Sequence, residues 1–219
     1  TEQWDTAKDG PPLILAARNA HKAFITAAAL LDLDIAWLWP QQQSLCSCPV
    51  SAQQLKQALA AQTRLPCAVY VTSPDYLGGV QDIAALADVC RVFGVPLLVD
   101  NAHGAYLRFL QPSQHPIDLG ATACCDSAHK TLPVLTGGAY LHISASAPQN
   151  YTANARQALA LFGSTSPSYL TLQSLDAANQ YLATDYPAQL AQCAGQIALL
   201  VGQLRQNGWV TAGQEPLKL

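Results

Sequence analysis

The sequence contains no methionine and few charged residues, and both shortages limit what kind of protein it can belong to. None of the 219 residues is Met, even at the first position, so we expect the sequence to be part of a longer protein. Asp, Glu, Lys and Arg together make up 11% of the residues, whereas 50% are hydrophobic. This balance is typical of a globular chain with a sizeable core and not of a disordered one.

Clusters of basic residues and long apolar runs are also missing. The net charge is -3, and no Lys/Arg cluster provides the positive surface that nucleic-acid binding requires. No stretch approaches the about 20 apolar residues of a membrane span. Residues 1–5 are too polar for the start of a signal peptide. We therefore expect no nucleic-acid partner, no membrane partner and a cytoplasmic location.

The cysteine pattern argues against disulfides and against a zinc finger. The seven cysteines are an odd number and include no C-x-x-C pair, which favours reduced thiols. Cys46 and Cys48 lie close together, but no second pair follows at finger spacing, so no metal site is expected. His115 and His142 belong to no motif, and we interpret both as structural.

Short apolar segments alternate with longer segments of helical periodicity. Strands are expected at residues 13–16, 35–38, 68–71, 95–100, 122–125 and 138–143, and helices at 21–31, 51–61 and 80–93. This order is typical of βαβ units and predicts an α/β fold, a three-layer sandwich with a mostly parallel sheet. We assign residues 1–150 to this domain. Residues 151–219 become helical, with a break at 163–168, and are interpreted as a continuation towards a small C-terminal domain.

Polar side chains follow several of the expected strands, at the edge of the sheet where ligands of open α/β folds bind. They include a lysine, an acid and two histidines, a set that suggests a pyridoxal phosphate (PLP) site. An amine holds this cofactor as a Schiff base, a carboxylate keeps its pyridine nitrogen protonated, and hydroxyl or imidazole groups bind its phosphate. The residues at the strand ends are Arg18, Asn19, His21, Thr72, Ser73, Asp100, His103, Ser127, His129 and Lys130.

Each of the main candidates also has a simpler interpretation. Lys130 could be a solvated surface lysine, and Asp100 could cap a helix that follows its strand. His21 could be an ordinary surface or core histidine instead of a ring over the cofactor. His103 could bond to a loop or could contact the phenolic oxygen of the cofactor. The convergence of all four at strand ends favours the cofactor site.

Four segments resemble, in order, the motifs of a known family. Residues 18–23 (RNAHKA) resemble R-N-x-H-K-S, and residues 99–104 (VDNAHG) resemble V-D-E-A-H-G. Residues 127–132 (SAHKTL) resemble S-x-H-K-T-L, and residues 164–176 contain STSPSY followed by SLD, as in S-T-S-P-S-Y…S-L-D. The sequence is thus similar to the large domain of the Orn/Lys/Arg decarboxylases, PLP-dependent transferase-like enzymes of fold type I.

The resemblance implies a role for each matching residue. Lys130, Asp100 and His21 would be catalytic: Lys130 forms the Schiff base, Asp100 pairs with the pyridine nitrogen, and His21 stacks on the cofactor ring. Ser166 or a neighbour would reach the phosphate of an adjacent subunit, which implies a homodimer or a higher homo-oligomer. The remaining residues implied to bind the cofactor are Ala102, His103, Ser127 and His129.

The implied reaction is decarboxylation of arginine, lysine or ornithine. Two alternatives stay open: another fold type I PLP enzyme, such as an aminotransferase or an aldolase/lyase, and a non-catalytic family member. The sequence also departs from the family pattern, because Asn101 replaces the usual glutamate and Ala23 the usual serine. The family's phosphate-binding loop would lie before residue 1, and its small C-terminal domain would follow residue 219.

Overall fold

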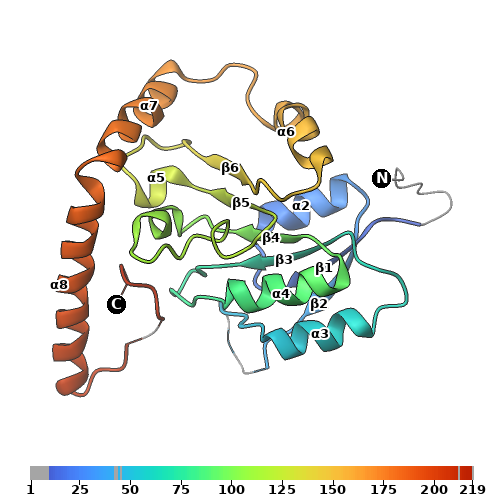
Figure 1. Cartoon of the computed structure of the whole chain (residues 1–219), viewed down its shortest axis with the longest axis horizontal. Helices are drawn as coiled ribbons and strands as arrows, with labels where there is room; N and C mark the ends of the chain where they lie inside the picture. The colour runs from blue at the N-terminus through green and yellow to red at the C-terminus, as the bar shows by residue number, and fades with distance from the viewer. Residues whose placement is uncertain (1–9, 42–43, 45, 212, 219) are drawn as a thin grey trace.

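The chain folds around a sheet of six strands in the order β2-β1-β3-β4-β5-β6 (Figure 1). The computed structural model describes residues 10–41, 44, 46–211 and 213–218. The first five strands are parallel and β6 is antiparallel to β5, so the prediction of a mostly parallel sheet is confirmed. The strands are β1 (Leu13–Ala17), β2 (Asp34–Leu38), β3 (Ala68–Thr72), β4 (Leu97–Asp100), β5 (Ala123–Asp126) and β6 (Tyr140–Ile143).

Helices cover both faces of the sheet, as the three-layer prediction requires. Helices α3 (Ala52–Ala60) and α4 (Ile83–Phe93) pack on one face, and α2 (Lys22–Leu30) lies on the other (Figure 1). Local signals set the ends of α3 and α4. Ser51 Oγ accepts a hydrogen bond from the backbone of α3, and Gly94, with φ of 68°, ends α4 in the left-handed conformation.

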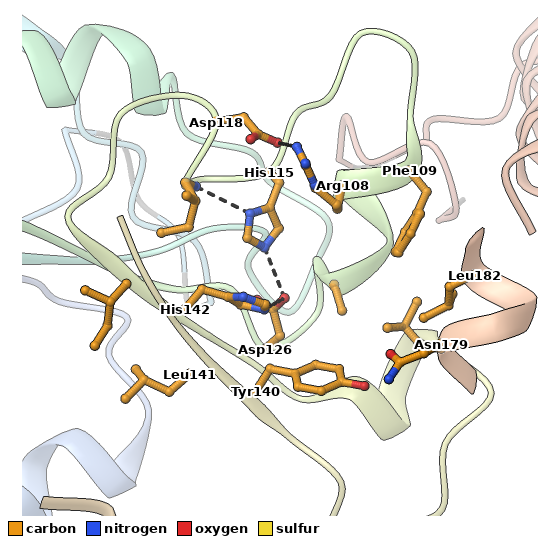
Figure 2. A pocket seen from close by; sticks show the side chains of 14 residues that line it. Arg108, Phe109, His115, Asp118, Asp126, Tyr140, Leu141, His142, Asn179 and Leu182 are labelled. Atoms are coloured by element: carbon orange, nitrogen blue, oxygen red, sulfur yellow. Dashed lines mark hydrogen bonds and ion pairs between the residues drawn. The ribbon is translucent and has the colours of Figure 1, made fainter. Parts of the chain in front are cut away.

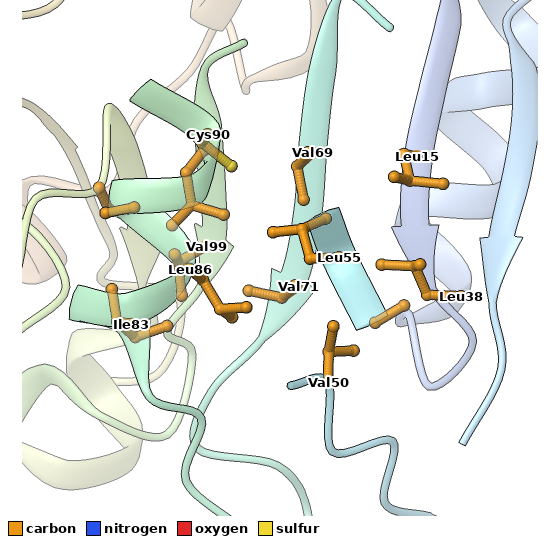
Figure 3. Packing of buried hydrophobic residues seen from close by; sticks show 14 of the residues in the cluster. Leu15, Leu38, Val50, Leu55, Val69, Val71, Ile83, Leu86, Cys90 and Val99 are labelled. Atoms are coloured by element: carbon orange, nitrogen blue, oxygen red, sulfur yellow. The ribbon is translucent and has the colours of Figure 1, made fainter. Parts of the chain in front are cut away.

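The core between the sheet and the α3/α4 face is built from alternating strand residues. Val69 and Val71 point from β3 towards Leu55 of α3 and Leu86 of α4 (Figure 3). Tyr70, between the two valines, points to the opposite face because successive side chains of a strand alternate. This alternation decides which strand residues stabilise the core and which are available to a site on the α2 face.

A second apolar cluster joins the end of the chain to the sheet domain. It combines the short helices η1 (Ala105–Phe109) and α5 (Ala128–Thr131) with α7 (Tyr169–Ala183) and α8 (Tyr186–Gln206). Helix α6 (Gln149–Phe162) lies between β6 and α7. Within the described part of the chain, no helix is both long and apolar enough to cross a membrane.

Candidate functional site

A cavity of about 630 Å³ opens at the carboxyl ends of the parallel strands. Residues from β3, β4 and β5 line it together with the first turn of α2 and the short helix α5. Of the residues singled out from the sequence, this cavity brings together His21, Asp100, Ala102, His103, Ser127 and Lys130.

Lys130 reaches this cavity because the chain turns sharply after β5. Its backbone N–H donates to the carbonyl of Ser127, which begins the four-residue helix α5. Its Nζ lies 3.2 Å from Nε2 of His103. Burial, followed by the nearby charge of Lys130, lowers the pKa of His103 below its usual value. The Nε2 of a neutral His103 can accept a hydrogen bond from the Lys130 amino group, so the amine is held at the cavity wall by an acceptor.

Asp100 ends β4 and is only 7% exposed. Its Oδ1 accepts a hydrogen bond from the backbone N–H of Ala102 at 3.2 Å, and its Oδ2 accepts one from the Tyr70 hydroxyl at 3.0 Å. The residue that caps the next helix, η1, is Gly104, so Asp100 is not a helix N-cap. Both oxygens are anchored, which fixes the direction of the carboxylate.

Tyr70 and Phe24 belong to the same wall, and neither was predicted from the sequence. Burial and the carboxylate of Asp100 raise the pKa of Tyr70, so the phenol keeps its proton and remains a donor. The Phe24 ring stacks on the Tyr70 ring, with centroids 4.2 Å apart and planes 21° apart. The alternation of Tyr70 with the core residues Val69 and Val71 could have indicated that Tyr70 points to the opposite face of the sheet. For Phe24, the sequence shows only that it lies in the first turn of α2.

His21 lies at the start of α2, where its side chain both caps the helix and lines the cavity. Its Nδ1 accepts a hydrogen bond from the backbone N–H of Ala23 at 3.1 Å. This bond caps the helix and leaves Nε2 as the protonated nitrogen in the neutral ring. The ring is therefore oriented by the helix end.

Two residues predicted to bind the cofactor are not part of this cavity in the single chain. The ring of His129 turns away, and its Nδ1 lies 3.0 Å from the carbonyl oxygen of Gly138. Ser166 lies in the exposed turn between α6 and α7, where its backbone N–H donates to Ser164 Oγ. Its predicted role involves a second subunit and stays a prediction.

The wall also offers polar atoms that have no hydrogen-bond partner among the described residues. Thr72 Oγ1 and Asn19 Oδ1 are both buried and unsatisfied, and both residues line the cavity. Buried polar atoms without partners are rare because each costs about 1–3 kcal/mol. An amine, an anchored carboxylate, two imidazoles and unpaired polar atoms around one cavity fit a polar aromatic cofactor such as PLP.

Comparison with protein families shows which family of this fold the chain belongs to. The family described as "Orn/Lys/Arg decarboxylase, major domain" matches residues 6–209. The chain belongs to the Orn/Lys/Arg decarboxylase family. Membership of this family implies dependence on PLP, in agreement with the residues that line the cavity.

Individual curated proteins are moderately similar to the chain. The uncharacterized protein YaaO of Bacillus subtilis (strain 168) is 36% identical over 172 residues, which cover 77% of this chain and 35% of YaaO. An arginine decarboxylase of Halalkalibacterium halodurans is 29% identical over 203 residues, or 86% of this chain and 40% of that protein. The chain thus spans two fifths or less of the length of these relatives.

Solved structures show the same fold at lower identity. The constitutive lysine decarboxylase of E. coli superposes with a TM-score of 0.67 at 22% identity, over 93% of this chain and 31% of that one. The similarity confirms the predicted fold type I architecture of the large domain.

Proposed function

We propose that this chain is the cofactor-binding portion of a PLP-dependent decarboxylase that acts on arginine, lysine or ornithine. The observation that carries the proposal is that the Lys130 amine and the anchored Asp100 carboxylate line one cavity at the strand ends. Family membership and the arginine decarboxylases among the relatives support decarboxylation as the reaction. When bound, PLP supplies an electron sink for the electron pair that remains when carbon dioxide leaves.

Each of the described residues would have its own role in such a site. Lys130 would hold the cofactor through its amine, and the neutral imidazole of His103, 3.2 Å away, would position that amine by accepting a hydrogen bond from it. Asp100 would pair with the pyridine nitrogen, and Tyr70 keeps the carboxylate in place. His21, oriented by the end of α2, would cover one face of the ring and exclude water from it.

The experiment uses the full-length protein with added PLP. We expect a yellow absorption band that borohydride bleaches while it fixes the cofactor covalently to the protein. A separate, untreated sample should release carbon dioxide and an amine from one of the three basic amino acids. A keto acid in place of carbon dioxide would identify an aminotransferase. Absence of the band would contradict the enzyme proposals and leave a non-catalytic family member.

Tyr70→Phe tests the anchoring of Asp100. A hydrogen bond to a charged group is worth about 1.5–3 kcal/mol, so we expect kcat to fall by about 10- to 100-fold while KM changes little. Steady-state kinetics measure both constants. Tyr151→Phe is the matched control, because Tyr151 lies on α6 outside the cavity and should leave both constants unchanged. Equal effects of the two substitutions would exclude an anchoring role for Tyr70.

We also propose that the active form is a homodimer or a higher homo-oligomer. Exposed apolar side chains flank, along the chain, the turn that carries Ser166, and exposed apolar surface is typical of interfaces between subunits. They are Leu161, Phe162, Tyr169 and Leu170, each at least 63% exposed.

Leu170→Asp should shift the protein from oligomer towards monomer, because it places a charge in this apolar surface. Analytical ultracentrifugation measures the shift. Val92→Asp, at an 81% exposed position on α4, is the control and should leave the mass unchanged. A wild-type protein that sediments as a monomer at all concentrations would contradict the proposal.

A further inference from the structure

A second group of chemically active side chains meets on the other face of the sheet, at a separate cavity of about 600 Å³ (Figure 2). His115 Nε2 and His142 Nε2 each lie 3.0 Å from the same carboxylate oxygen, Oδ2 of Asp126. One ligand atom from each of the three residues lies within 4.8 Å of the other two. None of the three belongs to the wall of the Lys130 cavity.

The sheet itself fixes two of these residues. Asp126 is the last residue of β5, and His142 lies on the antiparallel neighbour β6. The register pairs Cys124 with His142 and Asp126 with Tyr140, so Asp126 and His142 project from the same face. Asp100 and Cys125, at the cofactor cavity, project from the opposite face. A loop residue, His115, completes the group.

The loop that carries His115 is held by its own hydrogen bonds. The backbone N–H groups of Asp118 and Leu119 both donate to the carbonyl of His115, which closes a tight turn. The His115 ring is almost fully buried, at 4% side-chain exposure, and points at Asp126 (Figure 2). The three side chains are therefore oriented before any ligand binds.

The carboxylate of Asp126 is buried at 3% side-chain exposure and needs positive charge nearby. Asn101 Nδ2 donates to its Oδ1 at 2.7 Å and leaves Oδ2 to the histidines. Among the described residues, its only ion-pair partners are those two imidazoles, since the neighbouring Arg108 pairs with Asp118. A bound cation would compensate this charge and would use the histidine nitrogens that already surround it.

We propose that His115, Asp126 and His142 bind one zinc ion. Zinc binds imidazole nitrogen and carboxylate oxygen at about 2.0–2.2 Å, which places tetrahedral ligand atoms about 3.4 Å apart. The two nitrogen-to-oxygen separations of 3.0 Å are close to that spacing. The thiol of Cys124, 3.8 Å from His115 Nε2, favours a borderline-soft cation over magnesium or calcium.

Only small adjustments are needed to admit the ion. The two histidine nitrogens must each release a proton or turn it away from Asp126. When Nε2 of His115 binds the ion, the ring proton must lie on Nδ1. In the structure without an ion, Nδ1 accepts a hydrogen bond from the backbone N–H of Ile117 at 3.4 Å. This bond is long and therefore weak, so its loss costs little. The side chain of His142 is 39% exposed at the cavity edge, so its ring can shift towards the ion.

The site would tie three segments together close to the catalytic lysine. It joins β5, β6 and the loop after η1, and Asp126 is the last strand residue before the turn that leads to Lys130. Its role would therefore be structural, and removal of the metal should lower the melting temperature of the protein.

The test measures zinc directly and needs neither PLP nor substrate. The purified full-length protein is equilibrated with zinc, dialysed into metal-free buffer and analysed by inductively coupled plasma mass spectrometry. We expect one zinc per chain in the wild type, and at least 100-fold weaker binding in Asp126→Asn and in His142→Gln. Replacement by cobalt should give visible absorption bands that both variants lose.

Two controls separate this site from other zinc-binding groups. Asp118→Asn removes a carboxylate from the same cavity, and Cys46→Ser removes an exposed thiol; both should keep the zinc. If Asp126→Asn does not fold, the result for His142→Gln tests the proposal. This variant should fold, because the ring of His142 is partly exposed on the edge strand β6. A wild type without stoichiometric zinc, or a His142→Gln variant that binds as the wild type does, would overturn the proposal.

Discussion

Lys130→Ala should abolish both the covalent attachment of PLP and measurable decarboxylation. The amine is the group in the cavity that can bond to the cofactor and be fixed there by borohydride, and alanine offers no nucleophile in its place. We expect the yellow band to be absent and turnover to fall by several orders of magnitude. Absorption spectra before and after borohydride, with a carbon dioxide assay, measure both effects.

A matched lysine makes this result specific. Lys56 is exposed on α3, away from the cavity, and Lys56→Ala should retain the band and full turnover. Circular dichroism should show that both variants are folded. A Lys130→Ala protein that still forms a borohydride-fixed adduct would exclude Lys130 as the attachment site.

Asp100→Ala should cost about 10²- to 4 × 10³-fold in kcat. The carboxylate lines the cavity, where we propose that it pairs with the pyridine nitrogen. Removal of one partner from a buried ion pair costs about 3–5 kcal/mol, where 1.4 kcal/mol corresponds to a factor of ten. The loss should appear in kcat and not in KM, since the pair matters most when charge moves into the ring. Steady-state kinetics with saturating PLP measure the two constants separately.

A surface aspartate provides the control for Asp100. Asp88 pairs with Arg91 on the exposed side of α4, and Asp88→Ala should leave kcat unchanged. Asp100→Asn refines the test, because an amide keeps the shape of the side chain and removes its charge. Near-normal turnover in Asp100→Ala would show that the carboxylate has no role in the reaction.

The sequence allowed most of the fold to be predicted because periodicity is a local property. The strands at 13–16 and 68–71 are short apolar runs, and the helices at 51–61 and 80–93 have clear caps and apolar faces, so their positions agree with β1, β3, α3 and α4 to within a few residues. The short helices η1 and α5 were missed, because four or five residues are too few to show a helical period.

The Lys130 cavity could be predicted from the sequence for a geometric reason. The carboxyl ends of parallel strands meet at one edge, so Asp100 and Lys130, each placed after a strand, had to come close together once the sheet was recognised. The sequence motif does not specify the direction in which each histidine side chain points. His129, next to Lys130 in the same motif, turns towards the backbone of Gly138 because the neighbours along a tight turn point in different directions.

The sequence by itself therefore determined the fold class, the family and the segments that line the Lys130 cavity. Tertiary structure alone decided which side chains support that cavity, as Tyr70 does for Asp100, and which distant residues meet elsewhere. His115 and His142 had no motif, and only the antiparallel pairing of β6 with β5 brings them onto Asp126. The physical reason is that spacing along the chain records local periodicity, whereas contacts between strands and loops depend on register, which no single segment specifies.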